Sequence, residues 1–144
     1  MTTPESPYGS SAAENVAGGG PVRLPHLLAA KAEGTRLTMI TAYDGLTAAI
    51  FDEAGMDMIL VGDSIGNVML GHGSTLPVSL DEMVVAARSV ARAVQRAFVI
   101  ADLPFGTYEA GPEQALASAV RLMKAGANAV KLEGGTPRAA SVRA

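Results

Sequence analysis

Short apolar runs alternate with longer segments of helical spacing along most of the chain. The apolar runs cover residues 37–42, 58–62, 98–101 and 129–132, and the segments between them repeat apolar residues three and four positions apart. Strands that are almost continuously apolar and alternate with helices are typical of a parallel sheet covered by helices. The pattern therefore predicts an α/β fold with four strands and three connecting helices.

Two architectures fit this pattern. A complete (β/α)8 barrel takes roughly 250 residues, or about 30 for each strand with its helix, so four strands amount to half a barrel. A small, open, doubly wound sheet needs no further strands. The hydrophobic pattern alone leaves both architectures open.

The predicted helices have recognisable first and last residues. Asp44 precedes the first of them as an N-cap, and Ser79 forms a capping box with Glu82 at the start of the second. Pro112 occupies a first-turn position of the third helix, and Gly126 follows its end. These signals support the division of the chain into alternating strands and helices.

The beginning of the chain differs in composition from the rest. Residues 1–22 are expected to form a disordered tail, because they are rich in Gly, Ser, Ala, Thr and Pro and show no hydrophobic periodicity. A short helix is expected to follow from Arg23, closed by Gly34. Residues 23–144 are long enough for one domain with its own core.

Composition and charge narrow the class of protein. The 144 residues carry a formal net charge of -3 with scattered Lys and Arg, so no basic face for nucleic acid is expected. The chain has no cysteine, which leaves oxygen or imidazole ligands for any metal. No apolar run approaches the roughly 20 residues of a membrane helix. We expect a cytoplasmic protein with a small-molecule ligand and no membrane or nucleic-acid partner.

Acidic residues follow three of the four apolar runs. Asp63 and Ser64 come after the second run, Asp102 after the third and Glu133 after the fourth. Because the carboxyl ends of parallel strands lie at one edge of the sheet, these side chains are expected to converge there. Converging carboxylates repel one another unless a cation binds between them. Oxygen ligands with room left for substrate and water suit Mg²⁺, so we predict a magnesium site.

Alternation along the strands predicts which side chains face the same way. Lys131 and Glu133 have the same parity, so the lysine is expected to face the barrel interior beside the carboxylate. By the same rule, Ile59 and Val61 are expected to share the inner face with Asp63. Lys131 could then bind a carboxylate or carbonyl oxygen of the substrate.

A plainer interpretation exists for Asp63 and Ser64, because a polar residue directly after a strand is often only the N-cap of the next helix. For either residue alone the two interpretations are equally good. Asp102 is followed by Leu-Pro, which is a poor start for a helix, and a buried Lys131 has no capping role. The set is therefore more specific than any one of its members.

Five short motifs occur in order: Thr-Ala-Tyr-Asp at 41–44, Leu-Val-Gly-Asp-Ser at 60–64, Ser-Thr-Leu-Pro-Val at 74–78, Ala-Asp-Leu-Pro-Phe at 101–105 and Val-Lys-Leu-Glu-Gly-Gly at 130–135. Together they resemble the ketopantoate hydroxymethyltransferase family. The resemblance implies that residues 23–144 are the N-terminal half of a TIM-barrel catalytic domain, here truncated. It also implies a homo-oligomer when the chain is full length.

The activity implied by the resemblance is transfer of a hydroxymethyl group from 5,10-methylenetetrahydrofolate to 3-methyl-2-oxobutanoate. The product is 2-dehydropantoate (ketopantoate), on the route to pantothenate, and the reaction passes through a Mg-stabilised enolate. The family's magnesium positions fall on Asp63, Asp102 and Glu133. Its oxo-acid contacts fall on Asp63, Ser64, Asp102 and Lys131. The family's general base, a glutamate, is expected beyond the last residue given.

Two other interpretations stay open. One is a Mg-dependent carbon–carbon lyase of the phosphoenolpyruvate mutase and isocitrate lyase superfamily, which shares a barrel and metal-bound oxo acids and equally fits the Lys-Leu-Glu-Gly-Gly segment. The other is an inactive truncated fragment, because an open half barrel leaves strand edges and an apolar interior uncovered.

Overall fold

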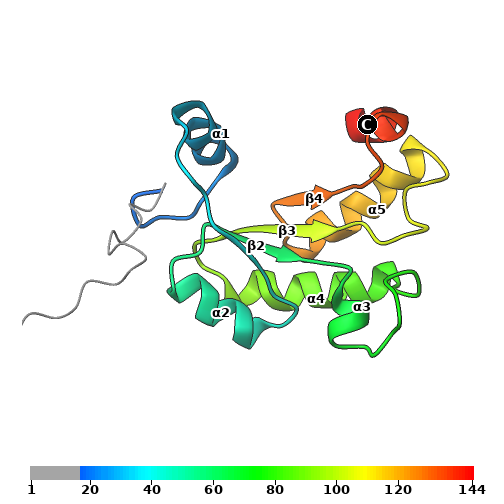
Figure 1. Cartoon of the computed structure of the whole chain (residues 1–144), viewed down its shortest axis with the longest axis horizontal. Helices are drawn as coiled ribbons and strands as arrows, with labels where there is room; N and C mark the ends of the chain where they lie inside the picture. The colour runs from blue at the N-terminus through cyan, green and yellow to red at the C-terminus, as the bar shows by residue number, and fades with distance from the viewer. Residues whose placement is uncertain (1–16) are drawn as a thin grey trace, which may run out of the picture.

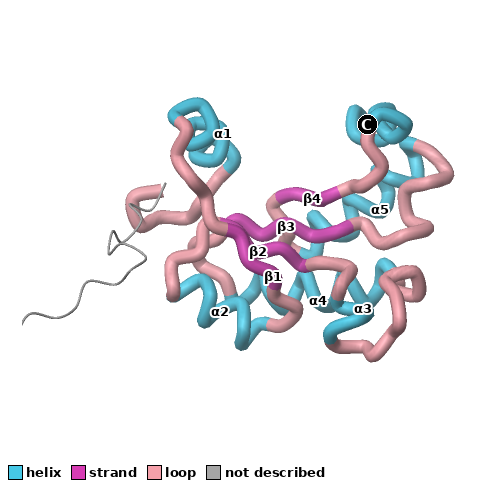
Figure 2. Tube along the Cα trace, in the orientation of Figure 1, coloured by secondary structure: helices cyan, strands magenta, loops and turns pink. Residues whose placement is uncertain are grey.

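A parallel four-stranded sheet forms the centre of the described part of the chain, residues 17–144 of a computed structural model. The strands are β1 (Met39–Thr41), β2 (Met58–Val61), β3 (Phe98–Asp102) and β4 (Ala129–Lys131), and they lie in the order β1-β2-β3-β4 (Figures 1 and 2). Every neighbouring pair is parallel. The α/β prediction is therefore confirmed: β1, β2 and β4 lie within the predicted segments, and β3 extends one residue past its segment, to Asp102.

Three longer helices carry the chain from one strand to the next and lie together on one face of the sheet: α2 (Gly45–Glu53), α4 (Leu80–Ala93) and α5 (Pro112–Ala125) (Figure 1). The first helix, α1 (Leu24–Glu33), lies on the other side of the sheet. Three short helices were not predicted, namely α3 (Ile65–Val68), η1 (Thr136–Arg138) and α6 (Ala139–Arg143). The last of these is five residues long and contacts α5. None of the described helices has the length and apolar character needed to span a bilayer.

The N-terminal segment is partly fixed. Residues 1–16 of the predicted tail lie outside the described residues. Val22, at the predicted boundary, is only 4% exposed, and its N–H donates to the carbonyl of Arg96 at 2.8 Å. This bond joins the segment before α1 to the start of β3.

The helix ends agree with the sequence signals. Asp44 Oδ1 accepts the N–H of Thr47 at 2.9 Å, which caps α2. Ser79 and Glu82 form the reciprocal capping box, with the Ser79 N–H donating to Glu82 Oε2 at 2.7 Å. Gly126 ends α5 with φ +116, and a Cβ there would lie 2.6 Å from Cβ of Ala91. Only glycine allows α5 to end this close to α4.

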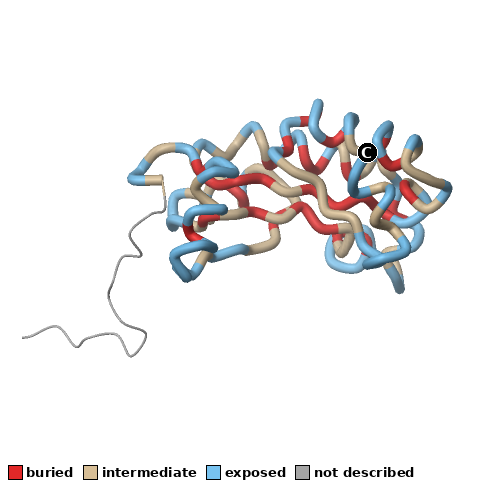
Figure 3. Tube along the Cα trace, turned by 90° about the horizontal axis from the view of Figure 1, so that it is seen from above, coloured by how far each residue is buried: buried red, intermediate tan, exposed pale blue. Residues whose placement is uncertain are grey.

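Strand register decides which residues enter the core. Ile59 pairs with Val99, Val61 pairs with Ala101, and all four are at most 3% exposed beneath the helices. The prediction that Ile59 and Val61 share the inner face with Asp63 is therefore wrong; the inner face of β2 belongs to Leu60. The chain leaves the strand after Val61 and turns, so the alternation does not extend to Asp63. Figure 3 shows buried and half-buried residues along the strands.

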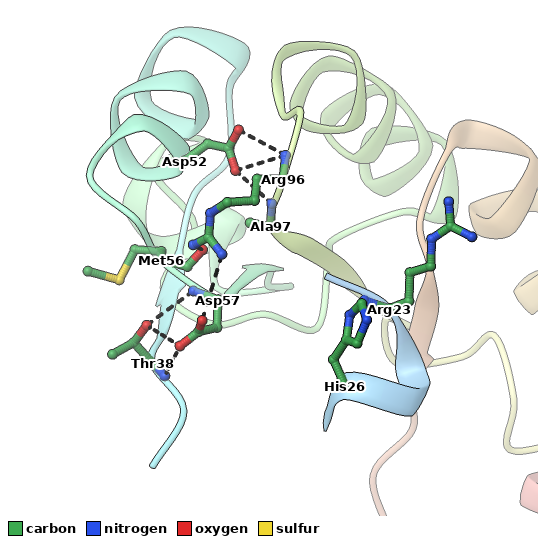
Figure 4. A network of polar contacts seen from close by, with 8 residues as sticks. All are labelled: Arg23, His26, Thr38, Asp52, Met56, Asp57, Arg96 and Ala97. Atoms are coloured by element: carbon green, nitrogen blue, oxygen red, sulfur yellow. Dashed lines mark hydrogen bonds and ion pairs between the residues drawn. The ribbon is translucent and has the colours of Figure 1, made fainter. Parts of the chain in front are cut away.

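An aspartate at the end of α2 fixes the start of β3. The carboxylate of Asp52 accepts the backbone N–H group of Gln95 at 2.8 Å. It also accepts those of Arg96 at 3.1 Å and Ala97 at 2.6 Å (Figure 4). Hydrogen bonds to a charged acceptor are stronger than those between neutral groups. One side chain therefore satisfies three consecutive donors where the chain enters the sheet.

A second carboxylate joins the starts of the first two strands. Asp57 is 5% exposed, and its Oδ2 accepts the N–H and the hydroxyl of Thr38, both at 2.9 Å (Figure 4). The guanidinium of Arg96 lies 3.8 Å from Asp57 Oδ1 and also donates to the carbonyl of Met56. The amino ends of β1, β2 and β3 are thus tied together by charge, away from the edge where the predicted site lies.

We predict that Asp52→Ala lowers the free energy of unfolding by about 2 to 3 kcal/mol, because three backbone donors lose a charged acceptor. Urea unfolding followed by far-UV circular dichroism measures the change. Glu53→Ala is the matched control, since Glu53 is exposed at the same helix end and should change stability by less than about 0.5 kcal/mol. Equal unfolding midpoints for the two variants would contradict the role assigned to Asp52.

Candidate functional site

The carboxyl ends of β2, β3 and β4 lie around one pocket. Asp63, Asp102, Lys131 and Glu133 line a single pocket of about 160 Å³. The remaining lining residues come from the loops after β2 and β3 and are Thr75, Leu76, Leu103, Phe105 and Tyr108. Four of the five residues predicted from the sequence are therefore brought together, and Ser64 lies in the turn beside them.

Asp102 is the central carboxylate of this pocket. It is the last residue of β3, its side chain is 7% exposed, and its Oδ2 accepts the N–H of Asp63 at 3.1 Å. The other oxygen, Oδ1, lies 3.0 Å from Lys131 Nζ as an ion pair but has no partner in hydrogen-bond geometry. Burial raises the pKa of Asp102, and the neighbouring Lys131 only partly opposes this effect. The carboxylate is thus buried, with Oδ2 bonded to the main chain and Oδ1 facing the ammonium group of Lys131.

Lys131 lies between two carboxylates. Its Nζ is 3.0 Å from Asp102 Oδ1 and 2.8 Å from Glu133 Oε1. Burial lowers the pKa of Lys131, but the contacts with Glu133 and Asp102 outweigh burial, and the pKa is raised overall. The hydrogen bond from Lys131 lowers the pKa of Glu133. At neutral pH the lysine is therefore a fixed cation and is unsuited to removing a proton.

The fit of this site to a divalent cation rests on Asp102. Its Oδ1 is the one buried side-chain oxygen or nitrogen without a hydrogen bond in the described part of the chain. Glu133 is 75% exposed and turned toward Lys131, and within residues 17–144 no three His, Asp or Glu side chains lie close enough to share a metal. Mg²⁺ usually takes only one or two protein carboxylates and completes its shell with water or substrate oxygens. Asp102 with Asp63 fits that kind of site.

Ser64 does not act as a helix cap. It stands at the N-cap position of α3, but its side chain makes no capping hydrogen bond. Its Oγ instead lies 2.8 Å from the hydroxyl of Tyr43, which holds the serine hydroxyl in place. Gly62 forms the wall behind it, because a Cβ there would lie 2.7 Å from Ser64 Oγ and 3.5 Å from Asp102 Oδ2.

Five lining residues of the pocket were not predicted from the sequence, namely Thr75, Leu76, Leu103, Phe105 and Tyr108. Leu76 and Phe105 are 60% and 57% exposed at the mouth, with Thr75 beside Leu76. Tyr108 is buried, and this burial together with the charges of Glu109 and Glu133 raises the pKa of its phenol. A signal existed for four of them, because Thr75, Leu76, Leu103 and Phe105 belong to the motifs at 74–78 and 101–105.

The fold and the site together define a protein of the (β/α) barrel class, with its ligand-binding groups at the carboxyl ends of the strands. The sequence model of the family described as ketopantoate hydroxymethyltransferase matches residues 21–144. The chain therefore belongs to the ketopantoate hydroxymethyltransferase family.

Two proteins with similar sequences carry the same name. A 3-methyl-2-oxobutanoate hydroxymethyltransferase from Leifsonia xyli subsp. xyli is 59% identical over 123 residues, which are 85% of this chain and 44% of the relative. A protein of the same name from Thermobifida fusca is 56% identical over 138 residues, which are 95% of this chain and 47% of the relative. The chain spans less than half the length of these relatives.

Solved structures agree on the fold. A 2,3-dimethylmalate lyase, described as a member of the PEP mutase/isocitrate lyase superfamily, matches with a TM-score of 0.60 and 22% identity over 78% of this chain and 39% of its own. A phosphonopyruvate hydrolase in complex with oxalate and Mg²⁺ also gives a TM-score of 0.60, with 21% identity over 78% of this chain and 40% of its own. The four-stranded sheet is thus part of a (β/α)8 barrel fold.

We predict that Asp102→Asn raises the melting temperature of the chain at pH 7 by about 2–4 °C. Because the folded pKa of Asp102 is raised, the favourable contribution from its protonated form is fully present below the unfolded pKa and is lost as the pH rises through the folded pKa. Asparagine carries no charge at any of these pH values, so the variant does not lose this stability as the pH rises. Thermal unfolding by circular dichroism at pH 7 and at pH 4 checks that the difference shrinks at acid pH.

The control for this variant is Asp81→Asn, since Asp81 is 82% exposed and its ion pair with Arg121 lies at the surface. Its melting temperature should stay close to that of the wild type. If Asp102→Asn melted below the wild type at pH 7, the ion pair with Lys131 would outweigh the cost of burial.

Proposed function

We propose that this chain provides the oxo-acid and magnesium site of a 3-methyl-2-oxobutanoate hydroxymethyltransferase. The reaction takes the one-carbon unit of 5,10-methylenetetrahydrofolate to C3 of 3-methyl-2-oxobutanoate and gives 2-dehydropantoate. Family membership supports the reaction class, and the relatives at 56–59% identity bear this name. The geometry supports the binding roles of the residues at the strand ends.

The observation that carries the proposal is a buried carboxylate beside a fixed ammonium group. Asp102 Oδ1 is buried, and its partner is the ammonium group of Lys131, whose Nζ lies 3.0 Å away. A 2-oxo acid offers a carboxylate and an adjacent ketone, so it can meet a cation and an ammonium group at once. The pocket thus has a carboxylate that can hold the cation and an ammonium group that can bind the acid directly.

Each of the residues at the strand ends then has a distinct role in binding. Asp102 and Asp63 would hold the Mg²⁺, with Glu133 reaching it through water or after release from Lys131. Lys131 would bind an oxygen of the acid, and Ser64, held by Tyr43, would donate a hydrogen bond to another. When bound, Mg²⁺ would draw electron density from the ketone and make the C3 proton more acidic.

Removal of the C3 proton needs a base other than Lys131. The raised pKa of Lys131 keeps it protonated, so it holds the substrate instead of taking the proton. A general-base glutamate beyond residue 144, the contacts to the folate, homo-oligomeric assembly and a cytoplasmic location stay predictions. The lyase interpretation has less support, since the solved lyase is similar at 22% identity, in fold alone.

We predict that isothermal titration of 3-methyl-2-oxobutanoate into the chain gives measurable binding with Mg²⁺ and at least tenfold weaker binding with EDTA. Asp102→Ala and Lys131→Met should each weaken the Mg²⁺-dependent binding about 10- to 100-fold, because each removes a charge-assisted contact. Asp81→Ala is the control and should bind as the wild type does. Equal affinity with and without Mg²⁺, and no effect of Asp102→Ala, would contradict the proposed site.

A further inference from the structure

Tyr43 and Ser64 meet at the turn beside the pocket. The phenol oxygen of Tyr43 lies 2.8 Å from Ser64 Oγ, which is a usual length for a hydrogen bond between two hydroxyl groups. A Cβ on Gly62 would lie 2.7 Å from the same Oγ and 3.5 Å from Asp102 Oδ2. The serine hydroxyl is therefore close to the central carboxylate of the site, and the phenol of Tyr43 reaches it there.

The main chain is fixed on both sides of Tyr43. Ala42 is 1% exposed, and its N–H donates to the carbonyl of Leu60 at 3.1 Å, which extends the pairing of β1 with β2. Asp44, on the other side, caps α2. A residue between two such anchors has little freedom in its main chain, so the fold sets the direction in which the Tyr43 side chain leaves the turn.

The ring of Tyr43 packs toward the helices. It lines a hollow of about 420 Å³ bordered by α3 and α4, together with Ile65, Ala86 and Ser89. Tyr43 does not line the pocket that contains Asp102. Any effect of its hydroxyl on a ligand in that pocket therefore passes through Ser64.

Two hydroxyl groups in contact can be arranged in two ways, because each can donate one hydrogen and accept others. If Ser64 donated to Tyr43, the serine hydrogen would be used, and a ligand would meet only lone pairs. If Tyr43 donates, the hydrogen of Ser64 stays free. A phenol is a stronger acid than an aliphatic alcohol and is the better donor, and a carboxylate can only accept. Both facts favour donation from Tyr43.

We propose that Tyr43 is a positioning residue for the oxo acid: its phenol donates to Ser64 Oγ, and the serine hydroxyl donates in turn to an oxygen of the acid. The proposal rests on the proposed function, since it assigns the direction of one contact in that site. The hydrogen bond that Ser64 receives polarises its O–H bond and strengthens the bond that it makes. It also orders the hydroxyl before the acid binds, which lowers the entropic cost of binding.

The experiment is a double-mutant cycle. Tyr43→Phe removes the hydroxyl and keeps the ring. In isothermal titration of 3-methyl-2-oxobutanoate with Mg²⁺ present, it should weaken binding about three- to tenfold. Ser64→Ala should weaken binding at least as much, and the double variant no more than Ser64→Ala, because Tyr43 acts through Ser64. Additive losses, or wild-type affinity in Tyr43→Phe, would overturn the proposal.

Thr47→Val is the matched control, since it removes a neighbouring hydroxyl that donates to Asp44 Oδ2 at 2.8 Å. It should bind the oxo acid as the wild type does. Mg²⁺ alone should bind Tyr43→Phe as tightly as the wild type, because the carboxylates are unchanged, and a weaker Mg²⁺ affinity would overturn the proposal by showing a general disturbance of the site. Absence of wild-type binding to the oxo acid would instead overturn the proposed function, and the role of Tyr43 with it.

The contact itself can be measured without a ligand. The sequence has three tyrosines, so labelling with 3-fluorotyrosine gives three ¹⁹F NMR signals, and the signal missing in Tyr43→Phe belongs to Tyr43. Ser64→Ala should shift this signal because the phenol loses its partner, whereas Ser141→Ala on α6 should leave it in place. An unchanged Tyr43 signal in Ser64→Ala would overturn the proposal.

Discussion

All four strands run in the same direction, and each parallel step requires a helix to carry the chain back across the sheet. This geometry places all strand starts at one edge and all strand ends at the other. The register then sets Asp102 of β3 directly beside Lys131 of β4. The ion pair at the centre of the site is thus a direct result of how two neighbouring strands are aligned.

The amino ends and the carboxyl ends of the strands have different chemistry. At the amino ends, the carboxylates of Asp52 and Asp57 find several donors each and tie helix and strand starts together. At the carboxyl ends, Asp102 is buried, its pKa is raised by that burial, and Lys131 is the cation that faces it. The strand starts are therefore held by several backbone donors, while the strand ends place a buried carboxylate and a lysine at the pocket.

Local signals in the sequence were sufficient for the strands, the helix caps and the residues at the strand ends. They failed where the outcome depended on the path of the chain after a strand. Ile59 and Val61 face the helices, and Asp63 does not share their face because the chain turns after Val61 and the alternation ends there. Glu133 is turned toward Lys131, a choice between partners that spacing cannot decide. The bonds of Asp52 to residues 95–97 join positions more than 40 apart, with no local pattern to indicate them.

Gly62 shows how the site limits its own variation. The wall behind Ser64 is main chain without a side chain, and a methyl group there would lie 2.7 Å from Ser64 Oγ and press on it. A larger residue at position 62 would therefore move the Ser64 hydroxyl away from its place beside Tyr43. The loop residues Leu76 and Phe105 line the same pocket but are exposed, so the shape of its opening can change there without disturbing the core.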